Sequence, residues 1–81
     1  MKTFHLTVAK VGENLYDADA VSASLPGSEG MFQILAEHEP FVSELVPGEM
    51  HIKAPDDRIH RFELSRGGIA EVSRNQATIL L

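Results

Sequence analysis

Hydrophobic and polar residues alternate along most of this chain with a period of two residues. Phe4, Leu6 and Val8 are separated by polar residues near the N-terminus, and the same alternation recurs over residues 21–25. A period of two is typical of a strand with one buried face, whereas an amphipathic helix repeats every 3.6 residues. The pattern therefore predicts that strands are the main elements of the fold.

Further short apolar runs lie between segments rich in turn residues. The runs cover residues 31–35, 41–46, 69–72 and 77–81. Between them, Met50 and Ile52 alternate with polar residues, and further apolar residues occur within 59–64. Turns are expected at residues 12–14, 26–30, 47–48, 54–58 and 73–76. Gly, Pro, Asp and Asn in these turn segments favour reversal of the chain. Short strands with turns between them predict an all-β fold, an antiparallel sandwich or barrel, in one domain over residues 1–81.

One segment also fits a helix, because apolar residues between Gln33 and Glu44 fall at helical spacing. Pro40 argues against this helix, since proline lacks a backbone N–H donor and its ring clashes with the preceding turn. We therefore predict short strands joined by a loop.

Composition restricts the chemistry available to the chain. The 81 residues include no cysteine, which excludes a disulfide framework, a thiolate metal site and a cysteine nucleophile. Four Phe, one Tyr and no Trp leave the core to be built mainly from aliphatic side chains. A domain of this size buries only about 60% of its unfolded surface, so we expect modest stability and a gain from docking to a partner.

Charge and hydropathy argue against two classes of partner. The formal net charge is −5 and the seven Lys and Arg residues are scattered, so a nucleic-acid interface is not expected. No apolar run approaches the ~20 residues needed to span a bilayer, and residues 1–7 lack the apolar core of a signal peptide. We expect a soluble chain without direct membrane insertion, recruited to a membrane only by a partner protein.

The four histidines are the candidates for metal binding. Zinc sites need three or four ligands that converge at about 2 Å, and these histidines are far apart in the sequence. His51 and His60 become cross-strand neighbours if the hairpin turns at Asp56, which supplies two ligands at most. We predict no metal site.

Neither catalysis nor cofactor binding is indicated by the motifs. Serine chemistry needs a nucleophile beside a base, and no strand–turn–helix elbow exposes a serine. The glycine-rich segments at residues 27–30 and 66–68 lack the pattern of a phosphate loop, so we interpret their glycines as turn or bulge residues at positive φ. Asp56 and Asp57 are interpreted as turn residues. The chain is predicted to be a non-enzyme without a cofactor.

Acidic and apolar residues come together over residues 29–44, where Met31, Phe32, Phe41 and Val42 accompany several glutamates. Methionine and phenylalanine on a loop-rich edge suit a protein interface. Their clustering predicts a surface that binds another protein.

A set of short motifs follows one order along essentially the whole chain. The set comprises Phe4-His5-Leu6, Pro26-Gly27-Ser28-Glu29-Gly30, Ile34, His38-Glu39-Pro40, Leu45, Pro47-Gly48, Ile52, Gly67-Gly68-Ile69-Ala70-Glu71-Val72, Asn75 and Ile79-Leu80. This order resembles the N-terminal β-sandwich domain of the epsilon subunit of bacterial F-type ATP synthase. The resemblance implies a flattened antiparallel β-sandwich of about ten short strands.

The same resemblance implies a function. It indicates a non-catalytic rotor subunit of the central stalk, which couples rotation of the membrane c-ring to the gamma subunit during ATP synthesis. Such a subunit is held peripherally at the cytoplasmic face of the bacterial inner membrane. By this resemblance, the loop at Glu29, Gly30 and Met31 is expected to face the c-ring, and Met31 replaces an acidic residue found in many relatives.

A second set of residues is expected to lie towards gamma. His38 and Pro40 match the His-x-Pro motif of the family, and Ser43 follows them. The residue before this motif is usually glycine in the family and is Glu37 in this chain.

Most relatives continue into a two-helix hairpin that regulates hydrolysis and in some of them binds ATP. This sequence ends at Leu81, so those two roles are not expected of it. The alternative function belongs to a different class of protein: a free-standing β-sandwich adaptor that binds another protein outside the synthase. A small metal-dependent enzyme is a third class.

Overall fold

The structure, a computed structural model, describes residues 2–81, so Met1 of the predicted domain lies outside the described residues. Within this range the chain forms nine strands and no helix, which confirms the all-β fold with nine strands where about ten were expected. The strands are β1 (Phe4–Lys10), β2 (Glu13–Ala20), β3 (Ser22–Gly27), β4 (Gly30–Leu35), β5 (Phe41–Leu45), β6 (Gly48–Lys53), β7 (Ile59–Leu64), β8 (Gly68–Ser73) and β9 (Gln76–Leu80).

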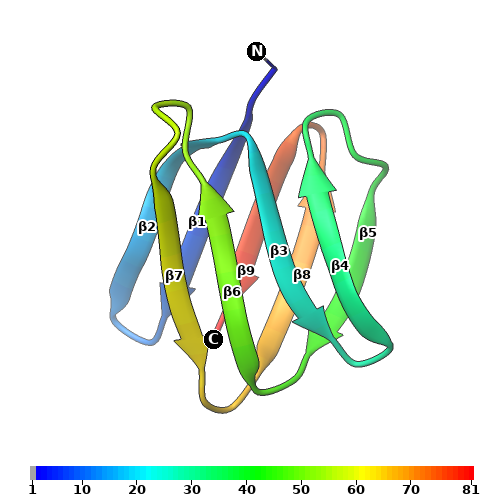
Figure 1. The fold of residues 1–81 in the computed structure, drawn as a ribbon. Helices are drawn as coiled ribbons and strands as arrows, with labels where there is room; N and C mark the ends of the chain where they lie inside the picture. Colours follow the sequence, from blue (N-terminus) through cyan, green and yellow to red (C-terminus); the bar gives the residue numbers. More distant parts are fainter. Residues whose placement is uncertain (1) are drawn as a thin grey trace.

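The strands form two layers of one curled sheet (Figure 1). One layer has the order β2-β1-β9-β8-β5, and the other has the order β4-β3-β6-β7. The layers join at one corner, where Gly27 of β3 pairs with Leu45 of β5. At this corner Ser28 N–H donates a hydrogen bond to Glu44 O at 3.1 Å. The fold is therefore a β-sandwich whose layers are continuous through β3 and β5.

One strand pairing differs from the expected antiparallel arrangement. β1 and β9 are parallel, with Leu6 opposite Ala77, while the other strand pairs within residues 2–81 are antiparallel. β9 lies between β8, its hairpin partner, and β1. Two-residue turns specify antiparallel neighbours, whereas parallel strands need a long connection. The turn residues therefore do not specify the pairing of β1 with β9.

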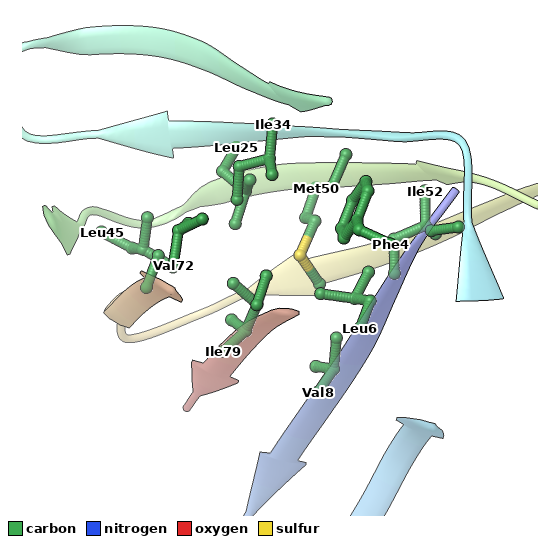
Figure 2. Close-up of a cluster of buried hydrophobic side chains, with 14 of the residues drawn as sticks. Phe4, Leu6, Val8, Leu25, Ile34, Leu45, Met50, Ile52, Val72 and Ile79 are labelled. Atoms are coloured by element: carbon green, nitrogen blue, oxygen red, sulfur yellow. The ribbon is translucent and has the colours of Figure 1, made fainter. Parts of the chain in front are cut away.

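The core lies between the layers and is built from the inward residues of each strand. Phe4, Leu6 and Val8 are at most 2% exposed, as their alternation predicted. Figure 2 shows side chains of both layers, among them Met50 of β6, pointing into one cluster. The cluster comprises Phe4, Leu6, Val8, Ala20, Ala23, Leu25, Ile34, Leu45, Met50, Ile52, Leu64, Ala70, Val72, Ala77 and Ile79. Each fully buried large apolar side chain contributes about 1.5–3 kcal/mol relative to an exposed one.

Strand β2 was not predicted. Of its eight residues only Ala20 is buried, because β2 is the edge strand of its layer. Tyr16, Ala18 and Ala20 alternate with Asp17 and Asp19, but two of these three inward residues are small alanines. The turn before it is shorter than expected: Gly12 lies in the turn at φ 77, while Glu13 and Asn14 already belong to β2. Val21, which was expected in a strand, precedes β3. Backbone pairing with β1 holds β2 in place, and Leu15 and Tyr16 pack against the edge of the core.

The segment with helical spacing forms β4, a loop at residues 36–40, and β5, so the exclusion of a helix is confirmed. Pro40 ends the loop immediately before β5. Residues 2–81 contain no helix of the length and hydropathy needed to cross a membrane.

The predicted pairing of His51 with His60 is wrong. In the β6–β7 ladder His51 lies opposite Arg61, and His60 lies opposite Ile52. Directly opposite residues share a face and successive residues alternate, so the two histidines lie on opposite faces of the layer. The hairpin does turn around Asp56, but its register differs by one residue from the register that would join the histidines.

Candidate protein interface

The residues expected to contact partners lie on one side of the sandwich. β4 and β5 are the outermost strands of their layers on this side (Figure 1). The β3–β4 turn lies at one end of β4, and the loop of residues 36–40 lies at the other end. A strand of six residues spans about 17–20 Å. The structure therefore separates the two predicted sets rather than bringing them together.

The first set lies at the tip of the β3–β4 hairpin. Glu29 and Gly30 are exposed there, and Met31 is 64% exposed. The prediction of positive φ is correct for Gly30, at φ +121, and wrong for Gly27. Gly27 is needed for space instead, because a Cβ there would lie 2.9 Å from Gly30 O. The two glycines make a tight tip beside the exposed Met31.

The second set begins in the loop of residues 36–40. Glu37 adopts φ 63, in the left-handed region that is costly for residues with a Cβ atom. This conformation explains why the resemblance leads one to expect glycine at this position. His38 N–H donates to Leu35 O at 3.2 Å and closes the turn that follows β4.

Asn75 ties this loop to two other segments. Its Oδ1 accepts a hydrogen bond from Glu37 N–H at 2.7 Å, and its Nδ2 donates to Thr3 O at 2.9 Å. The backbone oxygen of Asn75 accepts from His5 N–H at 3.2 Å. An exposed ion pair between Lys2 Nζ and Glu37 Oε2, at 3.0 Å, supports the same loop. The loop is thereby joined to the N-terminal segment and to the β8–β9 turn.

His38 belongs to a row of rings between the two layers. Its ring centroid lies 5.0 Å from that of Phe41, which lies 5.2 Å from that of Phe32 at an interplanar angle of 82°. Edge-to-face contacts of this kind are favourable. Glu39 O can only accept, so His38 Nδ1 donates to it at 2.7 Å. His38 is half-buried, and Pro40 after it is exposed.

Ser43 lies on the inner side of β5, not on its outer face. It pairs directly with Ala70, which is fully buried, so the two side chains share the inner face. Ser43 is half-buried, and its Oγ donates to Glu44 O at 3.0 Å. Ser43 is therefore only partly accessible to a partner.

An exposed apolar cluster on the outer face of β5, β8 and β9 was only partly predicted. Val42, Ile69 and Leu80 are 66%, 48% and 54% exposed, and we call them the outer apolar cluster. Ile69 lies directly opposite Leu80, and Val42 lies diagonally across from Ile69. Of these three residues, only Val42 was predicted from the sequence to lie in an interface. Strand alternation could have found Ile69, because assigning Ala70 and Val72 to the core leaves Ile69 on the other face.

Exposed carboxylates border the outer apolar cluster. Glu44 lies directly opposite Ile69, and Glu71 lies directly opposite Val42. An apolar centre with a polar rim is typical of protein interfaces. The acidic rim favours a partner whose matching surface is basic.

The two groups with shifted pKa lie outside this region. The hydrogen bond between Glu49 and His51 on β6 lowers the pKa of Glu49 below its usual value of 4.5. Burial raises the pKa of Tyr16 on β2, and Asp56 and Asp19 add to the effect. No group of three or more His, Asp or Glu residues within residues 2–81 is arranged to hold a metal ion. The outer face of β5, β8 and β9 therefore carries an apolar, acid-rimmed surface suited to binding another protein.

Comparison with known proteins points to one family. The profile of the ATP synthase Delta/Epsilon chain, beta-sandwich domain, matches residues 3–81. The ATP synthase epsilon chain of Delftia acidovorans is 32% identical over 80 residues, which cover 99% of this chain and 57% of that protein. The ATP synthase epsilon chain of Protochlamydia amoebophila is 34% identical over 77 residues, 95% of this chain and 52% of that protein. The chain thus spans little more than half the length of these curated relatives.

Solved structures share the fold. A chain of the Euglena gracilis mitochondrial ATP synthase, in an assembly of OSCP, F1 and c-ring, superposes with a TM-score of 0.89 at 24% identity, covering 96% of this chain and 49% of that chain. A chain of the central stalk and c-ring of Tetrahymena thermophila mitochondrial ATP synthase gives a TM-score of 0.78 at 17% identity, covering 98% of this chain and 63% of that chain.

Proposed function

Because this chain belongs to the family of the delta and epsilon chain β-sandwich domain of ATP synthase, we propose that it acts in the central stalk of an F-type ATP synthase. Its role there is non-catalytic: it joins the c-ring to the gamma subunit, so that rotation of the ring turns the stalk during ATP synthesis. These partners hold it at the cytoplasmic face of the bacterial inner membrane. The names of the matched relatives and the central-stalk and c-ring assembly of one solved neighbour support this role.

The observation that carries the proposal is the presence of two exposed surfaces: the hairpin tip at one end of β4, and a second surface that begins in the loop of residues 36–40 at the other end and continues along the outer face of β5. A subunit that transmits rotation must bind the ring and the stalk at the same time, which requires two separated contacts on one stiff body. A single buried cluster holds both layers together. Close-packed interiors of this kind deform little and transmit strain.

The hairpin tip is the proposed ring contact. Glu29, Gly30 and Met31 project at the end of a tight two-residue turn. Met31 contributes an exposed apolar side chain, which gains by being covered. The tip is small and prominent, which suits contact with short loops of a ring.

The β5 side is the proposed gamma contact. His38 and Pro40 lie in the loop before β5, and the outer apolar cluster begins at Val42 on β5 itself. Ser43 contributes the half-buried part of its side chain that remains accessible on β5. Covering Val42, Ile69 and Leu80 with a partner would remove from water the apolar surface that the isolated chain leaves exposed.

Binding of purified partners tests the two contacts separately. The chain is mixed with cognate gamma and, in a second experiment, with detergent-solubilised c-ring. Val42→Lys should abolish gamma binding and leave ring binding intact, because it places a charge in the outer apolar cluster at the end of β5 that is remote from the hairpin tip. Met31→Lys should weaken ring binding and leave gamma binding intact. Failure of the unmodified chain to bind gamma would refute the proposed role.

A further inference from the structure

Four strands of the sandwich have a side that pairs with no strand along most of its length within residues 2–81: β2, β4, β5 and β7. An open edge presents N–H and C=O groups that can pair with another chain. Proteins usually protect such edges with charged residues, prolines or bulges. The protection of the four edges is unequal in this molecule.

Three of the four edges carry charged residues: Glu13, Asp17 and Asp19 on β2, Glu44 on β5, and Arg61 and Glu63 on β7. β4 has the sequence Gly-Met-Phe-Gln-Ile-Leu, without a charge or a proline. Two of its residues, Met31 and Leu35, are 64% and 50% exposed on the outer face. β4 is therefore the least protected of these edges.

The geometry points to a second copy of this chain as the occupant of the β4 edge. The two copies pair antiparallel through β4, about a twofold axis at Gln33. Such an interface is isologous, with the same patch used by both copies. It extends the β4-β3-β6-β7 layer of one copy into the same layer of the other.

The sequence of β4 is self-complementary in this register. Directly opposite residues are Met31 with Leu35, Phe32 with Ile34, and Gln33 with Gln33. Opposite residues in an antiparallel pair lie on the same face, so apolar side chains meet on both faces and the two amides meet on the axis. A shift of one residue would place outer residues against core-facing ones. A shift of two would place the Gln33 amide opposite an apolar side chain.

Charges flank this pairing but do not lie within it. In the proposed register Glu29 of one copy approaches Glu37 of the other at each end, and Glu37 already forms an ion pair with Lys2 at 3.0 Å. Each chain also carries a net charge of −5. Salt screens repulsion between exposed charges. The dimer should therefore be favoured at higher ionic strength.

The pairing has a consequence for assembly. Met31 belongs to the β4 edge and also to the proposed ring contact, so a paired chain cannot bind the ring through its hairpin tip. Pairing would cover the open edge of the chain before it meets its partners. The pairing forms between isolated chains and does not depend on the proposed function.

A single introduced thiol tests the twofold contact, since the chain has no cysteine. Directly opposite Cα atoms in an antiparallel pair lie about 4.5–5.5 Å apart, within the range of about 4.4–6.8 Å that a disulfide bridges. Mild oxidation of Gln33→Cys should give a covalent dimer. Asn14→Cys, at an exposed position on the β2 edge, is the matched control and should remain monomeric at the same concentration.

The register has its own test. Met31→Cys alone should not cross-link, because the two thiols would lie about 14 Å apart along the strands. A mixture of Met31→Cys and Leu35→Cys chains should cross-link. If this mixture does not cross-link although Gln33→Cys chains form dimers, the proposed register is wrong.

Sedimentation of the unmodified chain measures the non-covalent pair. The dimer fraction should rise with salt, and Gln33→Lys should abolish it while Asn14→Lys leaves it unchanged. A chain that stays monomeric at all salt concentrations, or equal cross-linking at positions 33 and 14, would overturn the proposal.

Discussion

The side-chain oxygen of Asn75 accepts a hydrogen bond from the backbone N–H of Glu37 at 2.7 Å, although 38 positions separate the two residues in the sequence. Asn75 adopts φ 60, a conformation that asparagine tolerates better than most residues. One residue therefore completes the β8–β9 turn and also anchors the loop that carries His38 and Pro40. The geometry of this mid-chain loop therefore depends on a residue near position 81 of the sequence, in the β8–β9 turn.

Asn75→Ala should destabilise the fold by about 1–3 kcal/mol, because it removes two side-chain hydrogen bonds and places a Cβ-bearing residue without a polar side chain in the left-handed region. Urea unfolding measures the change. Asn75→Gly loses the same hydrogen bonds but tolerates φ 60, so its loss should be smaller. If Asn75→Ala unfolds at the same urea concentration as the unmodified chain, the two hydrogen bonds do not contribute to stability.

Glu37→Gly should stabilise the fold relative to Glu37→Ala by about 1 kcal/mol, because glycine adopts φ 63 without a Cβ penalty. Both substitutions remove the exposed ion pair with Lys2, so that loss cancels in the comparison. Thermal and urea unfolding measure the difference. Equal stability of the two variants would contradict a left-handed Glu37.

Gly67 and Gly12 offer a matched pair for a test of close packing. Their φ values are +76 and +77, but a Cβ on Gly67 would lie 2.2 Å from Leu45 O, whereas one on Gly12 meets nothing within 4 Å. Gly12→Ala should cost about 1–2 kcal/mol from backbone strain alone. Gly67→Ala should cost more, because β5 and the segment before β8 must move apart. Similar losses in unfolding free energy would contradict the contact between Gly67 and Leu45.

Substitutions at Met31 and Met50 should show, by their effects on the free energy of unfolding, which of the two methionines lies in the core. Met31→Asp should change the free energy of unfolding by no more than about 0.5 kcal/mol, because the side chain is 64% exposed. Met50→Ala should cost about 2–5 kcal/mol, because Met50 is fully buried between the layers. A large loss in Met31→Asp would place Met31 in the core and remove the hairpin tip as a contact surface.

The carboxyl group of Glu49 should titrate below 4.5, because His51 forms a hydrogen bond with its ionised form. A carboxyl whose pKa is lowered by folding stabilises the fold above its unfolded pKa, and this contribution disappears as the pH falls through the folded pKa. NMR titration of the Glu49 side chain measures the shift directly. His51→Ala should return the midpoint towards 4.5, and an unchanged midpoint would contradict the hydrogen bond.

Sequence patterns predicted the parts of the fold that depend on local burial and turn chemistry. Alternation identified β1 and β3 because each has one face in the core, and Pro40 excluded a helix between β4 and β5. β2 was missed because its alternating inward residues are Tyr16 and two alanines, which give a weaker hydrophobic pattern than the large apolar residues of β1. The parallel pairing of β1 with β9, and the register that separates His51 from His60, depend on contacts between segments that local turns do not specify.

The candidate interface was predictable in part. Exposure of Glu29, Gly30 and Met31 follows from the glycine turn, and the structure agrees. Ser43 lies on the inner side of its strand because of its pairing with Ala70, which only the ladder of β5 with β8 reveals. The outer apolar cluster joins residues of three strands and therefore forms only in the folded chain.

Cross-linking within a reconstituted assembly of this chain, cognate gamma and c-ring tests the central claim most directly. The cysteine-free sequence allows a single photoactivatable probe at Met31→Cys or at Val42→Cys. The proposed function predicts a covalent product with the ring subunit from position 31 and a product with gamma from position 42. Products with the same partner from both positions, or no product from either, would contradict two separate contact surfaces.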